Sequence, residues 1–567
     1  MERFAGRTIK KDKRNIAYFS MEIGLDSKIP TYSGGLGILA GDTIRSCADL
    51  HIPVVATTLL YRKGYFTQKL DSHGNQTESD VKWKPELFLK KTDKKVIVEI
   101  EDRKVAVTAW QYNVTGVAGY KIPVIFLDTN LKENNPYDRN ITNWLYGGDW
   151  KYRLCQEIIL GIGGVRILEA LGYNKIKKYH MNEGHSSLLI FELLRRQKGR
   201  KKKLTRKDYD AVRSKCLFTT HTPVPSGHDH FPLDVVKNSL KNIISPEEID
   251  AMSYQGNLDL THLAMDNSQY INGVAKKHGE ISRKMFPGHL IDSITNGIHS
   301  VVWTSKYFRE IYDKYIPGWQ KDSFSLRYAL GIPDYEIWNA HKKAKKDLID
   351  YVNKEHPSAD LKSHIFTIGF ARRSATYKRG TLLFSDINRL LEIAQKKGEI
   401  QIIYAGKAHP NDSQGKEIIK FIFSKMKELK GKISVVYLEN YGIEIAKKIV
   451  SGVDLWLNTP QKPLEASGTS GMKACHNGIP NLSILDGWWI EGHIENKTGW
   501  SIGTKAENSN EEDARDLYYK LDEKIVPKYY NNREQWINIM KHSIAYNASF
   551  FNTHRMMHQY VLNAYFR

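Results

Sequence analysis

Short apolar runs alternate with helical segments along almost the whole chain, and this alternation restricts the possible folds more than any other feature. Residues 365–371 form an apolar run, residues 382–397 repeat apolar side chains at helical spacing, and residues 400–405 form the next run. Strands separated by helices of this length pair in parallel through right-handed crossovers. The sequence therefore predicts the α/β class. The other expected strands are residues 16–20, 54–60, 96–100, 105–110, 124–128, 178–181, 216–220, 433–438 and 453–458, and the other expected helices include 38–50, 155–171, 187–196, 415–429, 442–451 and 468–476.

The strands and helices fall into two series, so we predict two doubly wound, Rossmann-like domains. With 567 residues the chain is long enough for two large cores. The expected boundary follows the segment TNGIH and gives an N-terminal domain over 1–299 and a C-terminal domain over 300–535. Residues 536–567 carry aromatic side chains at helical spacing, which predicts C-terminal helices that pack back on the body.

The chain is strongly basic, with 84 Lys and Arg against 63 Asp and Glu and a formal net charge of +21. Such a balance fits nucleic acid, an anionic membrane surface or small anionic ligands such as phosphates. The lysine-rich runs lack the interleaved aromatic residues of a single-strand binding platform. We therefore expect the excess charge to lie on solvated helix surfaces, with no nucleic-acid partner.

Cysteine usage and hydropathy indicate the compartment. Four scattered cysteines with no CxxC pair exclude a disulfide framework and a cysteine zinc site, which is typical of a reducing cytoplasm. No window reaches 18 uninterrupted apolar residues, and the basic N-terminus has no apolar stretch behind it. The prediction is a cytoplasmic protein without a membrane partner.

The first candidate site is the glycine segment SGGLG at residues 33–37. It follows the strand over residues 16–20 and opens a helix, where backbone N–H groups can approach an anion. A purely structural turn remains an alternative. The segment is not GxGxxG, and no acidic residue stands about 20 positions further on, so a redox dinucleotide is disfavoured.

The second candidate is the basic cluster Arg372, Arg373, Lys378 and Arg379, directly after the strand over 365–371. The carboxyl end of a parallel strand is where open α/β sheets bind ligands. Arginine gives planar bidentate contacts and lysine a point charge, a combination suited to phosphate. The alternative is a basic helix face.

The third and most specific candidate is EASGTSGMK at residues 465–473. A run of Ser, Gly and Thr between a strand and a helix is typical of a phosphate cradle. Lys473 follows in the same element, as in sites that hold pyridoxal 5′-phosphate through a lysine amine and a phosphate anchor. The residues alone do not distinguish a lysine that binds this cofactor covalently from a lysine that contacts a phosphate. A P-loop is excluded because the pattern GxxxxGK[ST] is absent.

Two histidine segments, at residues 180–185 and 220–228, also follow apolar strands. Neither contains HExxH, and histidines at strand ends more often bind hydroxyls or backbone groups than a metal. We expect no metal site.

These motifs together resemble the α-glucan (glycogen, starch or maltodextrin) phosphorylase family in a short form. The matching segments run in order through AYFSMEIGLDSKIPTYSGGLGILAGD, HMNEGH, FTTHTPVPSGHD, TNGIH, GFARRSATYKR, YAGKAHP and LEASGTSGMKACHNG with ILDGWW. The resemblance implies a two-domain glycosyltransferase-B fold with the active site in the inter-domain cleft. It implies pyridoxal 5′-phosphate as cofactor.

The resemblance also implies residue roles. Lys473 is similar to the cofactor lysine, and Lys473, Arg373, Lys378 and His221 are the expected catalytic residues. The groups expected around the cofactor's phosphate are Thr469, Ser470 and Arg372. The groups expected to hold the substrate phosphate are Arg373, Lys378 and the backbone of Gly35. The expected contacts to the glucosyl unit are His221, Asn296, Tyr377, Glu465, Ser467 and Gly468.

Three departures from the family pattern affect the phosphate site. Ser470 and Gly471 stand where the family usually has Gly-Asn, Arg372 stands where mammalian-type members have lysine, and residues 374–376 differ from Ile-His-Glu. These changes preserve positive charge but leave the detailed phosphate geometry open.

The implied reaction is phosphorolysis of a terminal α-1,4-glucosidic bond, with α-glucan and inorganic phosphate as partners and α-D-glucose 1-phosphate as product. The resemblance further implies a homodimer. One alternative is a nucleotide-sugar-dependent glucan synthase of the same fold, but its E-x7-E signature has Lys473 in place of the second acid. A non-catalytic glucan-binding or nucleic-acid-binding protein is the other alternative.

Overall fold

The computed structural model describes residues 13–224, 227–504, 506 and 509–566, which fall into two compact units. Unit 1 takes the described residues up to Phe66, Asp80–Ile294 and those from Met557 onward, and unit 2 takes Thr67–Ser79 and Thr295–Met556. The predicted N-terminal domain includes residues 67–79, whereas this short hairpin belongs to unit 2. Its Gln68 side chain donates to the carbonyl of Gly406 at 2.9 Å. Sequence patterns could not show this contact because 338 residues separate its partners.

Unit 2 is built on a six-stranded sheet in which every neighbouring pair is parallel. Its order is β16-β15-β14-β17-β18-β19, so the chain moves outward from β14 in one direction and then returns to continue on the other side. The switch point therefore lies between β14 and β17, and the predicted parallel α/β sheet is confirmed. The strands are β14 (Phe366–Ala371), β15 (Ile400–Ala405), β16 (Ser434–Leu438), β17 (Leu455–Asn458), β18 (Asn481–Ile484) and β19 (Gly499–Ile502).

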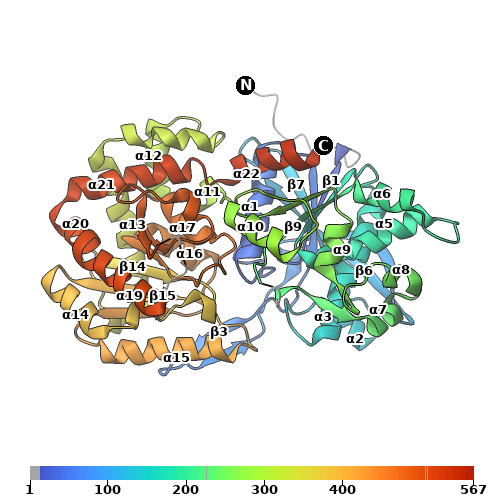
Figure 1. Ribbon diagram of the computed structural model, residues 1–567, viewed down its shortest axis with the longest axis horizontal. Coiled ribbons are helices and arrows are strands. Elements are labelled where there is room, and N and C mark those ends of the chain that lie inside the picture. Colours follow the sequence, from blue (N-terminus) through green and yellow to red (C-terminus); the bar gives the residue numbers. More distant parts are fainter. Residues whose placement is uncertain (1–12, 225–226, 505, 507–508, 567) are drawn as a thin grey trace. The chain divides into compact units, whose positions relative to one another are not determined.

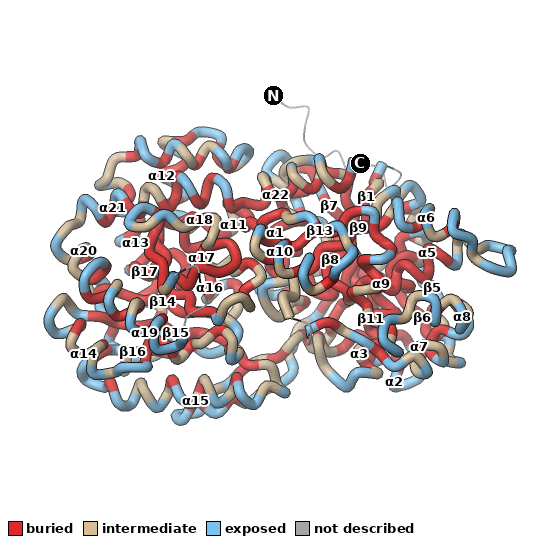
Figure 2. The backbone as a smooth tube through the Cα atoms, in the orientation of Figure 1, coloured by how far each residue is buried: buried red, intermediate tan, exposed pale blue. Residues whose placement is uncertain are grey.

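Amphipathic helices surround this sheet, and Figure 1 shows α14, α15 and α20 at the outside of the unit with β14 and β15 inside. Asp386 and Asp412 cap two of the helices by accepting hydrogen bonds from backbone N–H groups in the first turn. In Figure 2 the tube is buried along the strands and mostly exposed or intermediate along α15. The helices are α11 (Ser300–Trp303), α12 (Lys306–Tyr315), α13 (Asp334–Glu355), α14 (Ile387–Lys396), α15 (Ser413–Glu428), α16 (Ile443–Gly452), α17 (Thr469–Cys475), α18 (Trp489–Gly492), α19 (Asn510–Tyr519), α20 (Val526–Asn531) and α21 (Arg533–His542).

Unit 1 contains a nine-stranded sheet with the order β13-β12-β9-β8-β1-β2-β7-β6-β5. The seven strands from β13 to β7 are parallel, and the switch point lies between β1 and β8. The strands are β1 (Ile16–Ser20), β2 (Val54–Leu59), β5 (Lys90–Ile100), β6 (Arg103–Thr115), β7 (Lys121–Asp128), β8 (Lys178–Asn182), β9 (Cys216–Thr219), β12 (Tyr270–Gly273) and β13 (Ile291–Ser293), and the longer helices are α1 (Gly35–Asp49), α3 (Trp150–Ile158), α5 (Leu189–Lys198), α6 (Arg206–Arg213), α7 (Leu233–Leu240) and α10 (Lys276–Met285).

One edge of this sheet is antiparallel, where the expected strands 96–100 and 105–110 follow each other without a helix between them. β5 and β6 form a long antiparallel hairpin, and β6 is also antiparallel to β7. Only Glu101 and Asp102 separate β5 from β6, and so short a connection can join only antiparallel strands. Glu101 adopts a left-handed φ of +57° without being glycine or asparagine, and Asp102 beside it is of a residue type that favours turns.

The helix expected over residues 155–171 is interrupted by a π-helical turn at Ile159–Gly163, between α3 and α4 (Gly164–Ala170). Glycine permits close packing here: a Cβ on Gly161 would stand 2.5 Å from the backbone nitrogen of Leu189. This tight contact fixes the helix against α5.

The last residues of the chain pack on unit 1. The Tyr565 hydroxyl lies 2.8 Å from Nδ1 of His180, and the Tyr560 hydroxyl lies 3.1 Å from Oγ1 of Thr219. None of the helices in the described part of the chain is long and apolar enough to cross a membrane.

A buried charge cluster stabilises the sheet of unit 2 and yields a stability prediction. Asp454 is fully buried and accepts hydrogen bonds from Lys345 at 2.5 Å, His341 at 2.8 Å and the Thr367 backbone at 2.7 Å. Asp454→Ala leaves the buried ammonium of Lys345 without its carboxylate. We therefore expect the free energy of unfolding to fall by about 3–5 kcal/mol, which the midpoint of denaturant unfolding measures. The matched control Asp350→Ala removes an exposed ion pair with Lys346 and should cost at most about 1 kcal/mol. Equal losses in the two variants would contradict the account.

Candidate active site

The loops that follow β14 and β17 bring three charged side chains together at the switch point of unit 2. Glu465 Oε2 accepts from Nη2 of Arg372 at 2.6 Å and from Nζ of Lys378 at 2.6 Å. The three side chains are each about one-tenth exposed. One carboxylate oxygen thus binds two cations in a buried position, where open α/β sheets place their ligands.

The charges in this cluster are unequal, and that imbalance defines its chemistry. Burial by itself would raise the pKa of Glu465, but Arg372 and Lys378 outweigh it and lower the pKa to about 2. The remaining guanidinium nitrogens of Arg372, Nε and Nη1, are buried without a hydrogen-bond partner, as is the Ser467 hydroxyl. Buried unpaired donors are costly, so this arrangement is suited to an additional anion.

Tyr377 and Arg373 lie at the edge of this cluster. The Lys378 ammonium stands 4.3 Å from the centroid of the Tyr377 ring. Burial, the largest influence, would raise the pKa of Tyr377, but Lys378 and Arg373 together lower it below the usual value. Arg373 itself is exposed. The predicted basic cluster therefore divides into a buried part and a solvent-facing part.

Arg379, the fourth basic residue of the motif, has a structural role. Its guanidinium donates to the carbonyls of Thr459 and Pro460 and pairs with Asp513 at 2.7 Å. It thereby ties the loop after β14 to the loop after β17.

The segment 465–473 passes from a loop into the short helix α17. Gly468 has a left-handed φ of +85°, a conformation that glycine adopts without strain, and Thr469 begins the helix. The Ser470 hydroxyl accepts from Nε1 of Trp456 at 3.2 Å and donates to Asn458 at 3.4 Å. The hydroxyl of Ser470 therefore points at β17 and is already bound, in contrast to the unpaired hydroxyl of Ser467.

Lys473 is buried on α17, with its ammonium 3.9 Å from the centroid of the Trp303 ring. Asn296 is also buried in unit 2, and its Oδ1 has no partner. Arg555 donates to the carbonyls of Thr295 at 2.6 Å and Asn296 at 3.0 Å, which holds this segment in place. A buried amine and an amide acceptor thus lie in the same unit as the charge cluster.

Asp486, in the ILDGWW segment, is a supporting residue that the sequence analysis did not single out. Its carboxylate accepts from the backbone N–H of Glu465 and of Gly487, both at 2.9 Å. Burial, the largest influence, raises its pKa to about 6. A Cβ on Gly487 would stand 2.5 Å from the Ser467 carbonyl oxygen, so this turn packs directly under the Glu465–Gly468 loop. The sequence feature that could have indicated this role is a single aspartate within the otherwise apolar segment ILDGWW.

The glycine segment in unit 1 serves two purposes. A Cβ on Gly37 would stand 2.6 Å from a Glu22 oxygen, whereas Gly34 and Gly35 face open space within 4 Å. The Glu22 carboxylate accepts from the backbone N–H of Ser33 and of Gly34, and thereby fixes the loop that opens α1. Gly37 therefore has a structural role, whereas the binding role of Gly35 remains a prediction.

His221 follows β9, and its backbone N–H donates to Glu183 Oε2 at 2.7 Å. The same oxygen accepts from the Thr222 hydroxyl at 3.0 Å. Two residues of this histidine segment, Pro225 and Ser226, lie outside the described residues. Of the predicted site residues, Gly35 and His221 belong to unit 1 and all the others to unit 2.

Carboxylates and a histidine that could ligate a metal gather in unit 1 at Glu157, His185 and Asp229. Arg153 already pairs with Glu157 at 2.9 Å and with Asp229 at 3.0 Å. Burial, the largest influence, raises the pKa of Glu157 well above its usual range. The guanidinium therefore supplies the positive charge that a cation would bring.

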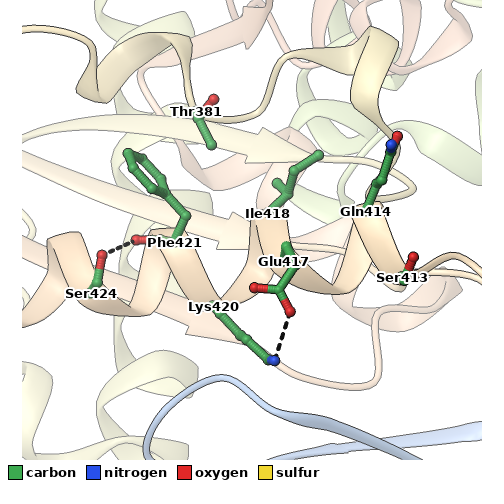
Figure 3. Close-up of a pocket in the computed structure, with 8 residues that line it drawn as sticks. All are labelled: Thr381, Ser413, Gln414, Glu417, Ile418, Lys420, Phe421 and Ser424. Carbon is green, nitrogen blue, oxygen red and sulfur yellow. Dashed lines mark hydrogen bonds and ion pairs between the residues drawn. The ribbon is translucent and has the colours of Figure 1, made fainter.

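An open groove of about 640 Å³ lies on α15, between its exposed face and Thr381 (Figure 3). Its two charged residues, Glu417 and Lys420, pair with each other at 2.7 Å. The groove contains none of the predicted site residues, and we place the candidate site at the switch-point loops instead.

Known proteins resemble this chain over most of its length. Residues 245–521 match the family model for carbohydrate phosphorylases. The chain is 40% identical to a maltodextrin phosphorylase of Thermococcus litoralis, over 96% of this chain and 70% of that one. It is 36% identical to a glycogen phosphorylase of Aquifex aeolicus, over 98% and 86%, and 34% identical to one of Mycobacterium tuberculosis, over 97% and 70%. The chain belongs to the carbohydrate phosphorylase family.

For this carbohydrate phosphorylase the membership confirms the resemblance drawn from the motifs. The family match includes β14 and β17 and the loops that follow them, so it covers the buried cluster around Glu465. The roles of individual residues remain predictions.

The raised pKa of Asp486 gives a test of its position in this phosphorylase. The carboxyl protonates near pH 6 when folded and near pH 4 when unfolded, so between these values the folded protein binds the extra proton. Stability conferred by this group therefore falls as pH rises from about 4 to about 6. Relative to Asp486→Asn, the free energy of unfolding of the wild type should fall by about 3 kcal/mol as the pH rises over this interval. Denaturant unfolding at each pH measures it. A difference independent of pH would show that Asp486 is not buried as described.

Proposed function

We propose that the protein is an α-glucan phosphorylase that cleaves terminal α-1,4-glucosidic bonds of glycogen, starch or maltodextrin with inorganic phosphate. The product is α-D-glucose 1-phosphate, formed with retention. The observation that carries the proposal is the buried cluster around Glu465, with two unpaired nitrogens on Arg372. An anion with several oxygens can accept from such a guanidinium in a bidentate manner. Relatives named maltodextrin and glycogen phosphorylase support this choice of substrate.

The residues of unit 2 fit pyridoxal 5′-phosphate as cofactor. Lys473 offers a buried primary amine, and Arg372 offers unpaired cationic donors for a phosphate. Thr469 and the backbone of Ser470 open α17 beside them in sequence. When bound, the cofactor supplies a second phosphate group that can exchange a proton with the substrate phosphate, since a phosphate's second pKa lies near 6.

The chain's own groups bind and orient the reactants. Arg373, Lys378 and the Gly35 backbone hold the attacking phosphate, which gives a proton to the glycosidic oxygen as the bond from C1 to that oxygen breaks. A bond from C1 to a phosphate oxygen then forms on the same face, so the α configuration is kept. Positive charge beside the phosphate stabilises it next to the oxocarbenium-like centre. The groups proposed to contact glucosyl hydroxyls are His221, Asn296, Tyr377, Glu465, Ser467 and Gly468.

The unpaired atoms of unit 2 support these contacts. Ser467 presents a buried hydroxyl and Asn296 a buried amide oxygen, and neither has a protein partner. Buried polar groups are normally hydrogen-bonded, so a hydroxyl-rich ligand would satisfy both. We further propose that the two units form the two domains of a glycosyltransferase-B fold.

The alternatives are less favoured. A nucleotide-sugar-dependent synthase would carry an acid eight positions after Glu465, where this chain has Lys473. A non-catalytic binding protein would not need the buried amine and the unpaired guanidinium nitrogens. We propose a cytoplasmic location, because all four cysteines are unpaired and buried. A homodimer and the absence of a nucleic-acid partner remain predictions.

The cofactor assignment rests on Lys473. Purified protein should carry a borohydride-reducible chromophore, and Lys473→Ala should be colourless and inactive. Lys473→Arg is the matched control: it keeps the positive charge near Trp303 but cannot bind the cofactor covalently, so it should be colourless as well. Absorbance spectra and the mass of the reduced peptide give the readout. A chromophore retained in either variant would refute the role of Lys473.

The phosphate assignment rests on Arg373 and Lys378. Arg373→Ala should raise KM for phosphate with little change in KM for maltoheptaose; a hydrogen bond to a charged group contributes about 1.5–3 kcal/mol, and the exposure of Arg373 places its contribution at the lower end. Arg389→Ala is a suitable control, because Arg389 lies on α14, outside the site loops, and pairs with Glu392 at 2.7 Å. Initial rates over a matrix of both substrates separate the constants. A change confined to KM for the glucan would contradict the role.

A further inference from the structure

A directed chain of hydrogen bonds crosses the carboxyl ends of three neighbouring strands in unit 1. Ser20 ends β1 and Asn182 ends β8, and the two residues are paired in register. His221 lies two residues beyond the end of β9, the next strand of the sheet. Ser20 is fully buried and Asn182 is nearly so. These hydrogen bonds thus connect the partly exposed imidazole of His221 to the interior of the sheet.

The direction of each hydrogen bond is fixed by the first one. The Ser20 hydroxyl donates to the backbone carbonyl of Glu22 at 2.8 Å, and a carbonyl can only accept. The Ser20 oxygen can then only accept from Asn182, so the amide Nδ2 faces it at 3.1 Å. The amide oxygen of Asn182 therefore faces Nε2 of His221 at 2.7 Å. Because that oxygen is an acceptor, Nε2 of His221 must carry the proton.

The charge state of His221 completes the argument. Burial, the largest influence, lowers its pKa to about 4; nearby His278 and His185 act in the same direction, and Glu183 acts against them. His180, the other histidine in electrostatic contact, is itself held neutral by burial. At neutral pH the imidazole therefore has one N–H, on Nε2, and Nδ1 is an acceptor.

The backbone of His221 is fixed independently of its ring. Glu183 binds the His221 N–H at 2.7 Å and has a φ of +78°, a region that residues other than glycine rarely occupy. Such strain persists where the surroundings impose it, and it occurs frequently at functional sites. The ring and the backbone of His221 are thus both held by groups at the end of β8.

We propose that Ser20 and Asn182 are positioning residues that hold His221 as its Nε2–H tautomer, so that Nδ1 accepts a hydrogen bond from a hydroxyl of the glucosyl unit. The identity of the ligand rests on the proposed function, whereas the tautomer does not. The site then selects a group that donates a hydrogen bond at this position, and protonation of Nδ1 abolishes the interaction.

The tautomer is tested directly by 15N NMR of histidine-labelled holoenzyme. The His221 signal is identified by its loss in His221→Gln. We expect a protonated Nε2 and an unprotonated Nδ1 at pH 7.5. In Ser20→Ala the amide of Asn182 is released from its fixed orientation, and part of the population should change to the Nδ1–H tautomer. A protonated Nδ1 in the wild type would overturn the proposal, whether or not the enzyme carries out phosphorolysis.

A binding test uses Asn182→Asp, which keeps an acceptor beside Nε2 but adds a negative charge that favours the imidazolium. The acid limb of maltoheptaose binding, measured as the association constant in the absence of inorganic phosphate so that substrate-phosphate ionisation does not enter, should move from below pH 5 toward the ordinary histidine value near 6.5, giving about a tenfold loss at pH 5.5 relative to the wild type. Asn272→Asp is the matched control, since Asn272 is equally buried but binds Thr219 and Tyr560. Its acid limb should stay in place.

The outcomes separate the tautomer of His221 from the proposed function. An unmoved acid limb in folded Asn182→Asp would overturn the role of Asn182 in substrate binding. Wild-type protein with the expected tautomer but without phosphorolysis would refute the proposed function and leave the tautomer assignment standing. If Asn182→Asp does not fold, the wild-type and Ser20→Ala spectra decide the question.

Discussion

The structure of the site depends on one carboxylate. Glu465 accepts hydrogen bonds from Arg372 and Lys378 through a single oxygen, and this buried interaction joins the loop after β14 to the loop after β17. Two cations against one anion would be unfavourable in so buried a position if nothing else compensated them. The excess positive charge makes the switch point of unit 2 suited to an anion, and Asp486 holds the backbone of Glu465 there.

Much of the fold could be predicted because it follows from local patterns. β1 and β15 begin and end at the predicted residues, since a buried parallel strand is a short apolar run with clear limits. The β5–β6 hairpin follows from the expected strands 96–100 and 105–110, because the connection between them is too short for a parallel crossover, but the full length of both strands and the left-handed conformation of Glu101 could not be predicted. The hairpin that includes Gln68 joins unit 2 through a contact that no local pattern can show.

The residues of the candidate site could be predicted where charged residues or glycines lie close together in the sequence. They could not be predicted where a role depends on how separate segments pack against each other. Arg372, Lys378 and Lys473 lie in short motifs whose chemistry can be recognised. Asp486 and Asn182 act on segments far from them in sequence, and their roles emerge only when strands pair. The sequence also could not show that the Ser470 hydroxyl is already hydrogen-bonded to Trp456 and Asn458.

The central claim is that inorganic phosphate itself attacks the glucan. It is tested most directly by incubating the purified enzyme with maltoheptaose and 18O-labelled phosphate, in excess chelator and without any sugar nucleotide, and following the products by 31P NMR. The account predicts α-glucose 1-phosphate in which the oxygen bridging carbon and phosphorus carries the label. Turnover that requires a sugar nucleotide, or a product with an unlabelled bridging oxygen, would contradict it.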